Sequence, residues 1–144
     1  MFEQDYIMRI ILQFAEAIRR SMQKAAGEED KAGAAELLEA SIGEATDIDG
    51  SVLLSLAPES IAGVMQISGT DPQVSEYIAR TLLLEAQYLD EAGFAQKAEL
   101  RRGQAFAIAE AFAFGLDPEL DILSEEEWEE FFSGVPGEAD GQQA

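Results

Sequence analysis

Hydrophobic residues recur at helical spacing along most of this chain. The first 26 residues predict an amphipathic helix over residues 3–26, with an apolar stripe at steps of four, three and four formed by Ile7, Ile11, Phe14 and Ile18. Gly27 follows as a stop signal. The acidic run 28–30 favours a second helix start, because carboxylates stabilise the positive end of a helix. That helix is expected to end at Gly43 or in the loop 47–50.

Residues 50–69 predict two short helical pieces. Pro58 suits the opening turn of the second piece, where its missing N–H costs nothing. Gly69 is expected to close it. The apolar side of this second piece is predicted from Ile61, Val64, Met65 and Ile67.

The strongest pattern is a helical hairpin over residues 71–115. Asp71 is a predicted N-cap for a helix over residues 72–92, which is apolar on most sides and is therefore expected to be central. Gly93 marks the turn. Residues 105–114 alternate small and large, which could be a strand, but their alanines favour a helix over residues 94–114. Small residues that would let the two helices approach closely are Ala86, Ala98 and Ala105.

Two apolar stripes are expected on the second helix of this hairpin. One contains Phe94, Ala98, Ala105, Ile108, Ala109 and Phe112. The other, which needs a cover of its own, contains Leu100, Phe106 and Phe114. A basic spot formed by Lys97, Arg101 and Arg102 is expected to pair with acidic neighbours on its own surface, where such pairs contribute little.

A last helix is predicted from the capping box formed by Ser124 and Glu127. Its aromatic residues Trp128, Phe131 and Phe132 lie at positions i, i+3 and i+4 among glutamates. This amphipathic face either docks into a groove on a partner or folds back over the second stripe, and the second reading is favoured. These three residues are the candidate protein-binding residues of the chain.

Together these patterns predict an all-α fold, a helical bundle of about six or seven helices with a repeat-like antiparallel hairpin. Residues 1–133 are expected to form a single helical domain, and residues 134–144 a mobile polar tail. No stretch is long and apolar enough to predict a membrane span. With no cysteine there is no disulfide framework, and the cytoplasm is the expected location.

The charge distribution limits the classes of partner that the chain is expected to bind. The formal net charge is −20, and residues 116–144 carry ten acidic groups and no basic one. A field of this sign repels phosphates, so nucleic acid is not an expected partner. Solubility alone is the simplest explanation of such a charge.

The hairpin resembles a tetratricopeptide repeat. Leu82, Ala86 and Leu89 take the places of the Trp, Gly and Tyr of that family's first helix, and Ala98 and Ala105 match its second-helix alanines. The chain departs from the pattern at Glu85, Arg102 and Glu110, where Leu, an aromatic residue and Pro are expected. The resemblance implies close helix packing and a peptide-binding groove.

The N-terminus, Met-Phe-Glu-Gln-Asp-Tyr-Ile-Met-Arg over residues 1–9, resembles a family of small all-helical bacterial proteins of unknown function. The resemblance implies the fold class and a bacterial origin rather than an activity.

Residue types that carry most enzyme chemistry are missing. The chain has no histidine and no cysteine, which excludes histidine-based triads and the usual zinc sites. The run 47–50 is similar to a calcium loop, but its glycine falls at the wrong place, so a helix-capping turn is expected instead.

One enzyme reading remains. All-helical nucleotide pyrophosphohydrolases hold Mg²⁺ with paired Glu-x-x-Glu and Glu-x-x-Asp units. The chain contains one of each, formed by Glu36 with Glu39 and by Glu44 with Asp47. Only four residues separate the two pairs, too few for two long facing helices. We therefore predict no catalytic, cofactor-binding or metal residue. The leading hypothesis is an adaptor or regulatory module that binds another protein or itself.

Overall fold

The computed structural model describes residues 2–116, with side chains from Asp5 onward, and this part of the chain consists of helices joined by short loops, without a strand. The predicted all-α fold is confirmed. The elements in chain order are α1 (Phe2–Met22), a π-helical turn η1 (Gln23–Gly27), α2 (Lys31–Thr46), α3 (Gly50–Leu53), α4 (Pro58–Ile67), α5 (Pro72–Glu91) and α6 (Ala95–Ala111).

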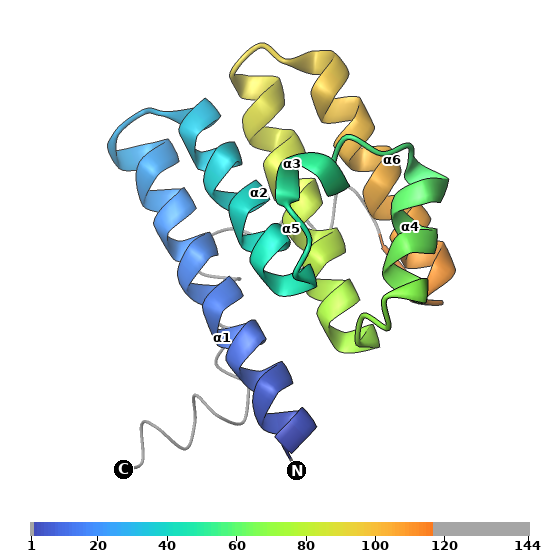
Figure 1. The fold of residues 1–144 in the computed structure, drawn as a ribbon. Helices are drawn as coiled ribbons and strands as arrows, with labels where there is room; N and C mark the ends of the chain where they lie inside the picture. Colours follow the sequence, from blue (N-terminus) through green and yellow to red (C-terminus); the bar gives the residue numbers. More distant parts are fainter. Residues whose placement is uncertain (1, 117–144) are drawn as a thin grey trace, which may run out of the picture.

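Helices α1, α2, α5 and α6 lie side by side in that order and run alternately up and down (Figure 1). The short helices α3 and α4 form the connection between α2 and α5, and α4 packs against α6 (Figure 1). Helix α5 therefore lies between α2 and α6 and contacts both. None of the helices in residues 2–116 is long and apolar enough to cross a bilayer.

Helix α5 is the most buried element, as its apolar pattern predicts. Its N-cap is Asp71, whose Oδ1 accepts hydrogen bonds from the backbone N–H groups of Gln73 at 2.8 Å and Val74 at 3.4 Å. The large apolar residues and the alanine at the close contact are buried on all of its faces: Val74, Tyr77, Ile78, Leu82, Leu83, Leu84, Ala86, Tyr88 and Leu89.

The hairpin of α5 and α6 turns at Gly93, as predicted. Gly93 has φ +92°, a conformation that glycine adopts without steric cost. Ala86, Ala98 and Ala105 are fully buried, so the small residues lie where the packing is closest. Helix α6 ends at Ala111, earlier than expected, because the backbone reverses at Ala113 with φ +60°.

The first helix ends differently from the expectation. Gly27 does not reverse the chain; it is the last residue of η1, and the left-handed residue is Glu29, with φ +55°. The backbone N–H of Asp30 reaches back to the Lys24 carbonyl at 3.0 Å, and Lys24 also pairs with the Glu28 and Asp30 carboxylates. These contacts close the helical turn η1 at Gly27, one residue beyond the predicted end of the helix. Asp30 then caps α2 through the Gly33 N–H at 2.8 Å.

Two predicted core residues are exposed. Ile67, placed on the apolar side of α4, is 90% exposed, because it is the last residue of that helix and the chain turns away at Gly69. Phe94, placed in the main stripe of α6, is 51% exposed. It precedes α6 as a non-helical cap residue with ψ +64°, and so it does not follow the helical spacing.

The run 47–50 is a capping turn, as expected. Asp47 closes α2 in the left-handed conformation, and Asp49 caps α3 by accepting from the Ser51 and Val52 N–H groups. The backbones of α2 and α3 meet here with no room for a side chain. A Cβ on Gly50 would lie 2.4 Å from the Glu39 carbonyl oxygen, which explains the glycine.

Candidate functional site

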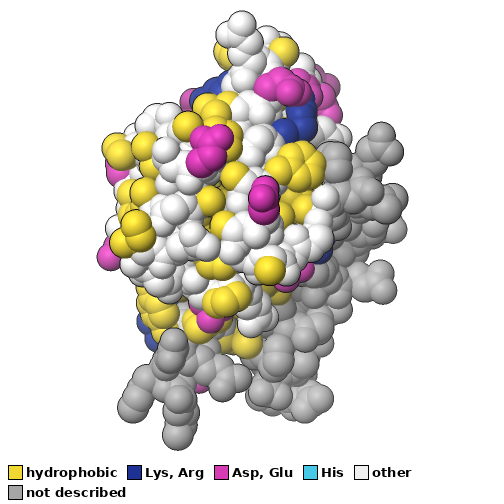
Figure 2. Space-filling view, turned by 90° about the vertical axis from the view of Figure 1, so that its right-hand side faces the viewer, with side chains coloured by type: hydrophobic (Ala, Val, Ile, Leu, Met, Phe, Trp, Pro, Cys, Tyr) yellow, Lys and Arg dark blue, Asp and Glu magenta, His cyan; other side chains and the backbone are white. Residues whose placement is uncertain are grey.

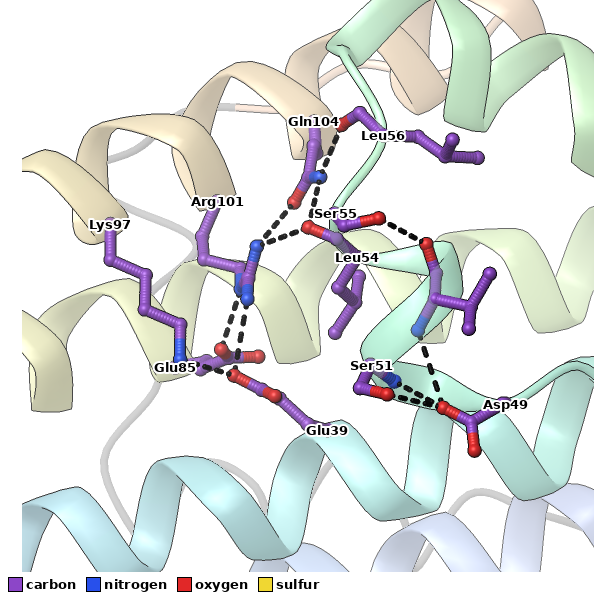
Figure 3. Close-up of polar contacts among 11 residues, drawn as sticks. Glu39, Asp49, Ser51, Leu54, Ser55, Leu56, Glu85, Lys97, Arg101 and Gln104 are labelled. Atoms are coloured by element: carbon purple, nitrogen blue, oxygen red, sulfur yellow. Dashed lines mark hydrogen bonds and ion pairs between the residues drawn. The ribbon is translucent and has the colours of Figure 1, made fainter.

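A buried ionic network joins α2, α5 and α6 at the middle of the helical array. The Nε of Arg101 on α6 donates to Oε2 of Glu85 on α5 at 2.6 Å, and its Nη2 donates to Oε2 of Glu39 on α2 at 3.1 Å. Lys97 approaches the same Glu39 oxygen at 3.3 Å. Figure 3 shows the guanidinium facing both carboxyl groups, with the Lys97 ammonium group beside them. One cation therefore holds three helices.

The network extends to the connection between α3 and α4. Nη1 of Arg101 donates to the Leu54 carbonyl at 2.7 Å and to Oε1 of Gln104 at 3.2 Å. The amide of Gln104 donates to the carbonyls of Leu54 at 3.0 Å and Leu56 at 2.8 Å (Figure 3). These carbonyls lie beyond the end of α3, where they have no helical partner, and the two side chains satisfy them.

The two carboxyl groups of the network titrate in opposite directions. Burial, followed by the facing Glu39 carboxyl, raises the pKa of Glu85 well above its ordinary value despite Arg101. Burial also acts to raise the pKa of Glu39, but hydrogen bonds from Glu85 and Arg101 and the charges of Arg101 and Lys97 outweigh it and lower the pKa.

We infer that the pair keeps one proton, on Glu85, which donates to the Glu39 carboxylate. Glu85 is 0% and Arg101 3% exposed. Because its groups bind one another away from solvent, this network positions helices.

A groove open to solvent lies where α2 ends and α5 begins. It has a volume of about 240 Å³ and is lined from α1, from the end of α2 and from the connection between α4 and α5. We call it the acidic groove, after the residues that define it: Tyr6, Ile10, Asp47, Thr70, Asp71 and Val74. Ile10 and Val74 are buried, whereas Tyr6 is 53% exposed.

The acidic groove contains two carboxylates and no described cation. Asp47 and Asp71 both line it, and the lining holds no Lys or Arg from the described residues. Arg9, three residues after Tyr6, is not part of the lining. Both aspartates also have local roles, Asp47 as the C-cap of α2 and Asp71 as the N-cap of α5.

No family model, curated protein or solved structure matches the chain. Its function therefore has to be inferred from the geometry of these two sites and of the surface.

Large apolar side chains are also exposed elsewhere on the helices. Besides Tyr6, Ile67 and Phe94, Val52 on α3 is 59% exposed. Figure 2 looks onto the side of α4 and α6 and shows hydrophobic side chains spread over this face with few charged groups among them. Phe106 of the second predicted stripe is exposed, while Leu100 and Phe114 are half-buried.

The basic spot predicted on the hairpin divides in two. Arg102 makes surface pairs, with Asp90 and Glu99 at 2.8 Å each, as expected. The expectation is wrong for Arg101, which is buried. Spacing along α6 could not reveal this, because the partners that make burial tolerable come from α2 and α5. The signal in the sequence was Glu85, a charged residue directly after the apolar run 82–84 of α5.

The residues of the Glu-x-x-Glu and Glu-x-x-Asp units lie on one helix and its cap. Glu36, Glu39 and Glu44 are on α2, and Asp47 follows it. Glu39 faces Arg101 and Lys97, while the other three are exposed. Within residues 2–116 no group of three or more His, Cys, Asp or Glu side chains is placed to hold a metal ion.

The candidate protein-binding residues Trp128, Phe131 and Phe132 lie outside the described residues, as do the predicted capping box and the tail 134–144. Their role stays a prediction.

Proposed function

We propose that this protein is a cytoplasmic adaptor or regulatory module that works by binding another protein or a second copy of itself. The observation that carries the proposal is the set of large apolar side chains exposed to solvent on three helices and at the N-cap of α6: Tyr6, Val52, Ile67 and Phe94, each more than half exposed. Removing such side chains from water is the main driving force of protein association, and aromatic residues are enriched at interfaces.

The framework under these side chains supports the same reading. The network around Arg101 fixes α2, α5 and α6 to one another, and the helices α1, α3 and α4, which carry three of the exposed side chains, pack against α2 and α6. A preorganised surface loses little conformational entropy on binding. The buried charges of this network are engaged with one another, and this supports a structural role for them.

Site-specific photo-crosslinking in the native cell tests the proposal. A photoreactive phenylalanine analogue is placed in turn at Tyr6, Val52, Ile67 and Phe94, with the charged, exposed Glu99 on α6 as the matched control position. We expect a discrete crosslinked product from at least one of the four positions and none from Glu99. Products that are absent from all four, or equal at Glu99, would contradict the proposal.

A thermal-shift scan with Mg²⁺, Mn²⁺ and nucleoside triphosphates tests the enzyme alternative. We expect no change in Tm, because an adaptor has no affinity for these ligands. A rise in Tm that needs both metal and nucleotide would favour the carboxylate hydrolase instead.

A further inference from the structure

We propose that the acidic groove binds the side chain of a lysine or arginine residue that a basic partner protein presents. This inference rests on the proposed function and names the chemistry of the partner. It starts from a contrast within the lining: Ile10 and Val74 are apolar and buried, while Asp47 and Asp71 are carboxylates at the same hollow. An occupant must therefore be apolar along its length and positively charged at its end.

Lysine and arginine side chains have this composition. They bury their methylene stems along apolar surface and keep a cationic end group in a polar setting. In the acidic groove the stem would lie against the half-buried Ile7, which lines the groove together with Ile10 and Val74, and the cation would lie near Asp47 and Asp71. The exposed ring of Tyr6 adds a face on which a cation can rest. The volume of about 240 Å³ accommodates one long side chain rather than a folded element.

The charge of the rest of the chain favours a basic partner. The net charge of −20 attracts cationic proteins from a distance and raises their association rate. The same charge opposes a second copy of this chain at the groove, since each copy would bring the same excess of acidic groups. Anionic ligands are opposed for the same reason.

Titration of the ¹⁵N-labelled protein with N-acetyl-lysine methylamide, followed by NMR, tests the proposal. The backbone amide signals of Tyr6, Thr70 and Asp71 are expected to shift in a saturable way, with a weak affinity that falls as salt is added. The matched probe is N-acetyl-norleucine methylamide, which has the same apolar stem without the amine. It is expected to bind less tightly by about two- to five-fold or more, the contribution of an exposed ion pair.

Two isosteric variants locate the binding. Asp47→Asn keeps the left-handed cap, which asparagine tolerates, and Asp71→Asn keeps the N-cap. Each is expected to weaken lysine binding by about two- to five-fold while the protein keeps its structure. Asp49→Asn, which caps α3 outside the groove, loses the same charge and is the control. Its lysine affinity should equal that of the wild type.

Three results would overturn the proposal. The first is equal binding of the norleucine and lysine probes, which would make the groove a simple apolar hollow. The second is an equal loss in Asp49→Asn and Asp47→Asn, which would reduce the effect to net charge. The third is the lack of any saturable shift at the groove.

Failure here is distinguishable from failure of the proposed function. If a crosslinked partner is captured equally well by the wild type and by the double variant Asp47→Asn, Asp71→Asn, the groove is not its docking site and the adaptor function stands. If lysine binds the groove but no position gives a discrete crosslink, the groove chemistry stands and the adaptor function does not.

Discussion

Helices α2 and α5, with their caps, supply two pairs of acidic side chains that differ in what balances them. Glu39 and Glu85 are inside the array, where Arg101 binds both at 3.1 and 2.6 Å. Asp47 caps the C-terminal end of α2 and Asp71 caps the N-terminal end of α5, and both line a groove with no described cation in its lining.

The difference shows how burial decides the role of a carboxylate. An interior pair must be neutralised within the fold, because an unpaired buried charge is too costly. The Glu39–Glu85 pair meets this requirement with one proton and one guanidinium. Asp47 is exposed and Asp71 is half-buried, so water reaches this pair without an internal cation and the pair remains available to a cation from another molecule. The first pair is a structural element, and the second is a recognition element.

The largest expected effect comes from removing the internal cation. Arg101→Met keeps the volume but leaves the buried Glu85 without its cation and Glu39 with Lys97 alone, so the free energy of unfolding should fall by about 3–5 kcal/mol. Urea denaturation measures it. The control Arg102→Met removes only surface pairs and should cost about 1 kcal/mol or less. Equal losses in the two variants would contradict the structural role of Arg101.

A smaller effect is expected from the corner that supports the network. In Gly50→Ala the new Cβ would lie 2.4 Å from the Glu39 carbonyl oxygen, so α3 must move away from α2. We expect the free energy of unfolding to fall by about 1–3 kcal/mol. The control Gly63→Ala, on α4 with open space around it, should change it by about 1 kcal/mol at most, in the stabilising direction. A stable Gly50→Ala protein would mean that α2 and α3 are not held this closely.

The smallest effect concerns the shared proton. The pKa of Glu85 is raised in the folded protein, so its contribution to stability is full at low pH and is lost as the pH rises from the ordinary value of 4.5 through the raised one. Glu85→Gln carries no titrating proton there. The stability of this variant relative to the wild type should therefore increase as the pH rises above 4.5.

Urea denaturation of the wild type and the variants from pH 3 to pH 8 measures this difference, because the window for Glu39 lies below the ordinary pKa of 4.5 and the window for Glu85 lies above it. Glu39→Gln is the matched comparison, because the pKa of Glu39 is lowered. The stability that Glu39 contributes is present above its ordinary pKa and is lost as the pH falls, so this variant should approach the wild type in acid. Parallel pH profiles of Glu85→Gln and wild type would exclude a proton on the pair.

The sequence predicts the fold well wherever the signal is local. The Asp71 cap, the turn at Gly93 and the small residues Ala98 and Ala105 depend on neighbours within a few residues or on one adjacent helix. They lie where the pattern places them.

What the sequence could not give depends on contacts between distant segments. Arg101 is buried because Glu39 and Glu85 reach it, from 62 and 16 residues away. The acidic groove forms because α1, the end of α2 and the start of α5 meet. Tyr6 belongs to an apolar stripe in sequence but ends at the edge of that groove, half-exposed. The spacing of apolar residues along one helix does not reveal which distant segments will come into contact.

The contrast between the two acidic pairs is tested most directly by their carboxyl signals. Side-chain ¹³C carboxyl NMR of the wild-type protein is recorded with and without N-acetyl-lysine methylamide. The signals of Asp47 and Asp71 should move with the added lysine derivative, while those of Glu39 and Glu85 stay unchanged. Movement of the Glu39 and Glu85 signals, or no movement at Asp47 and Asp71, would contradict the assignment of one pair to structure and the other to recognition.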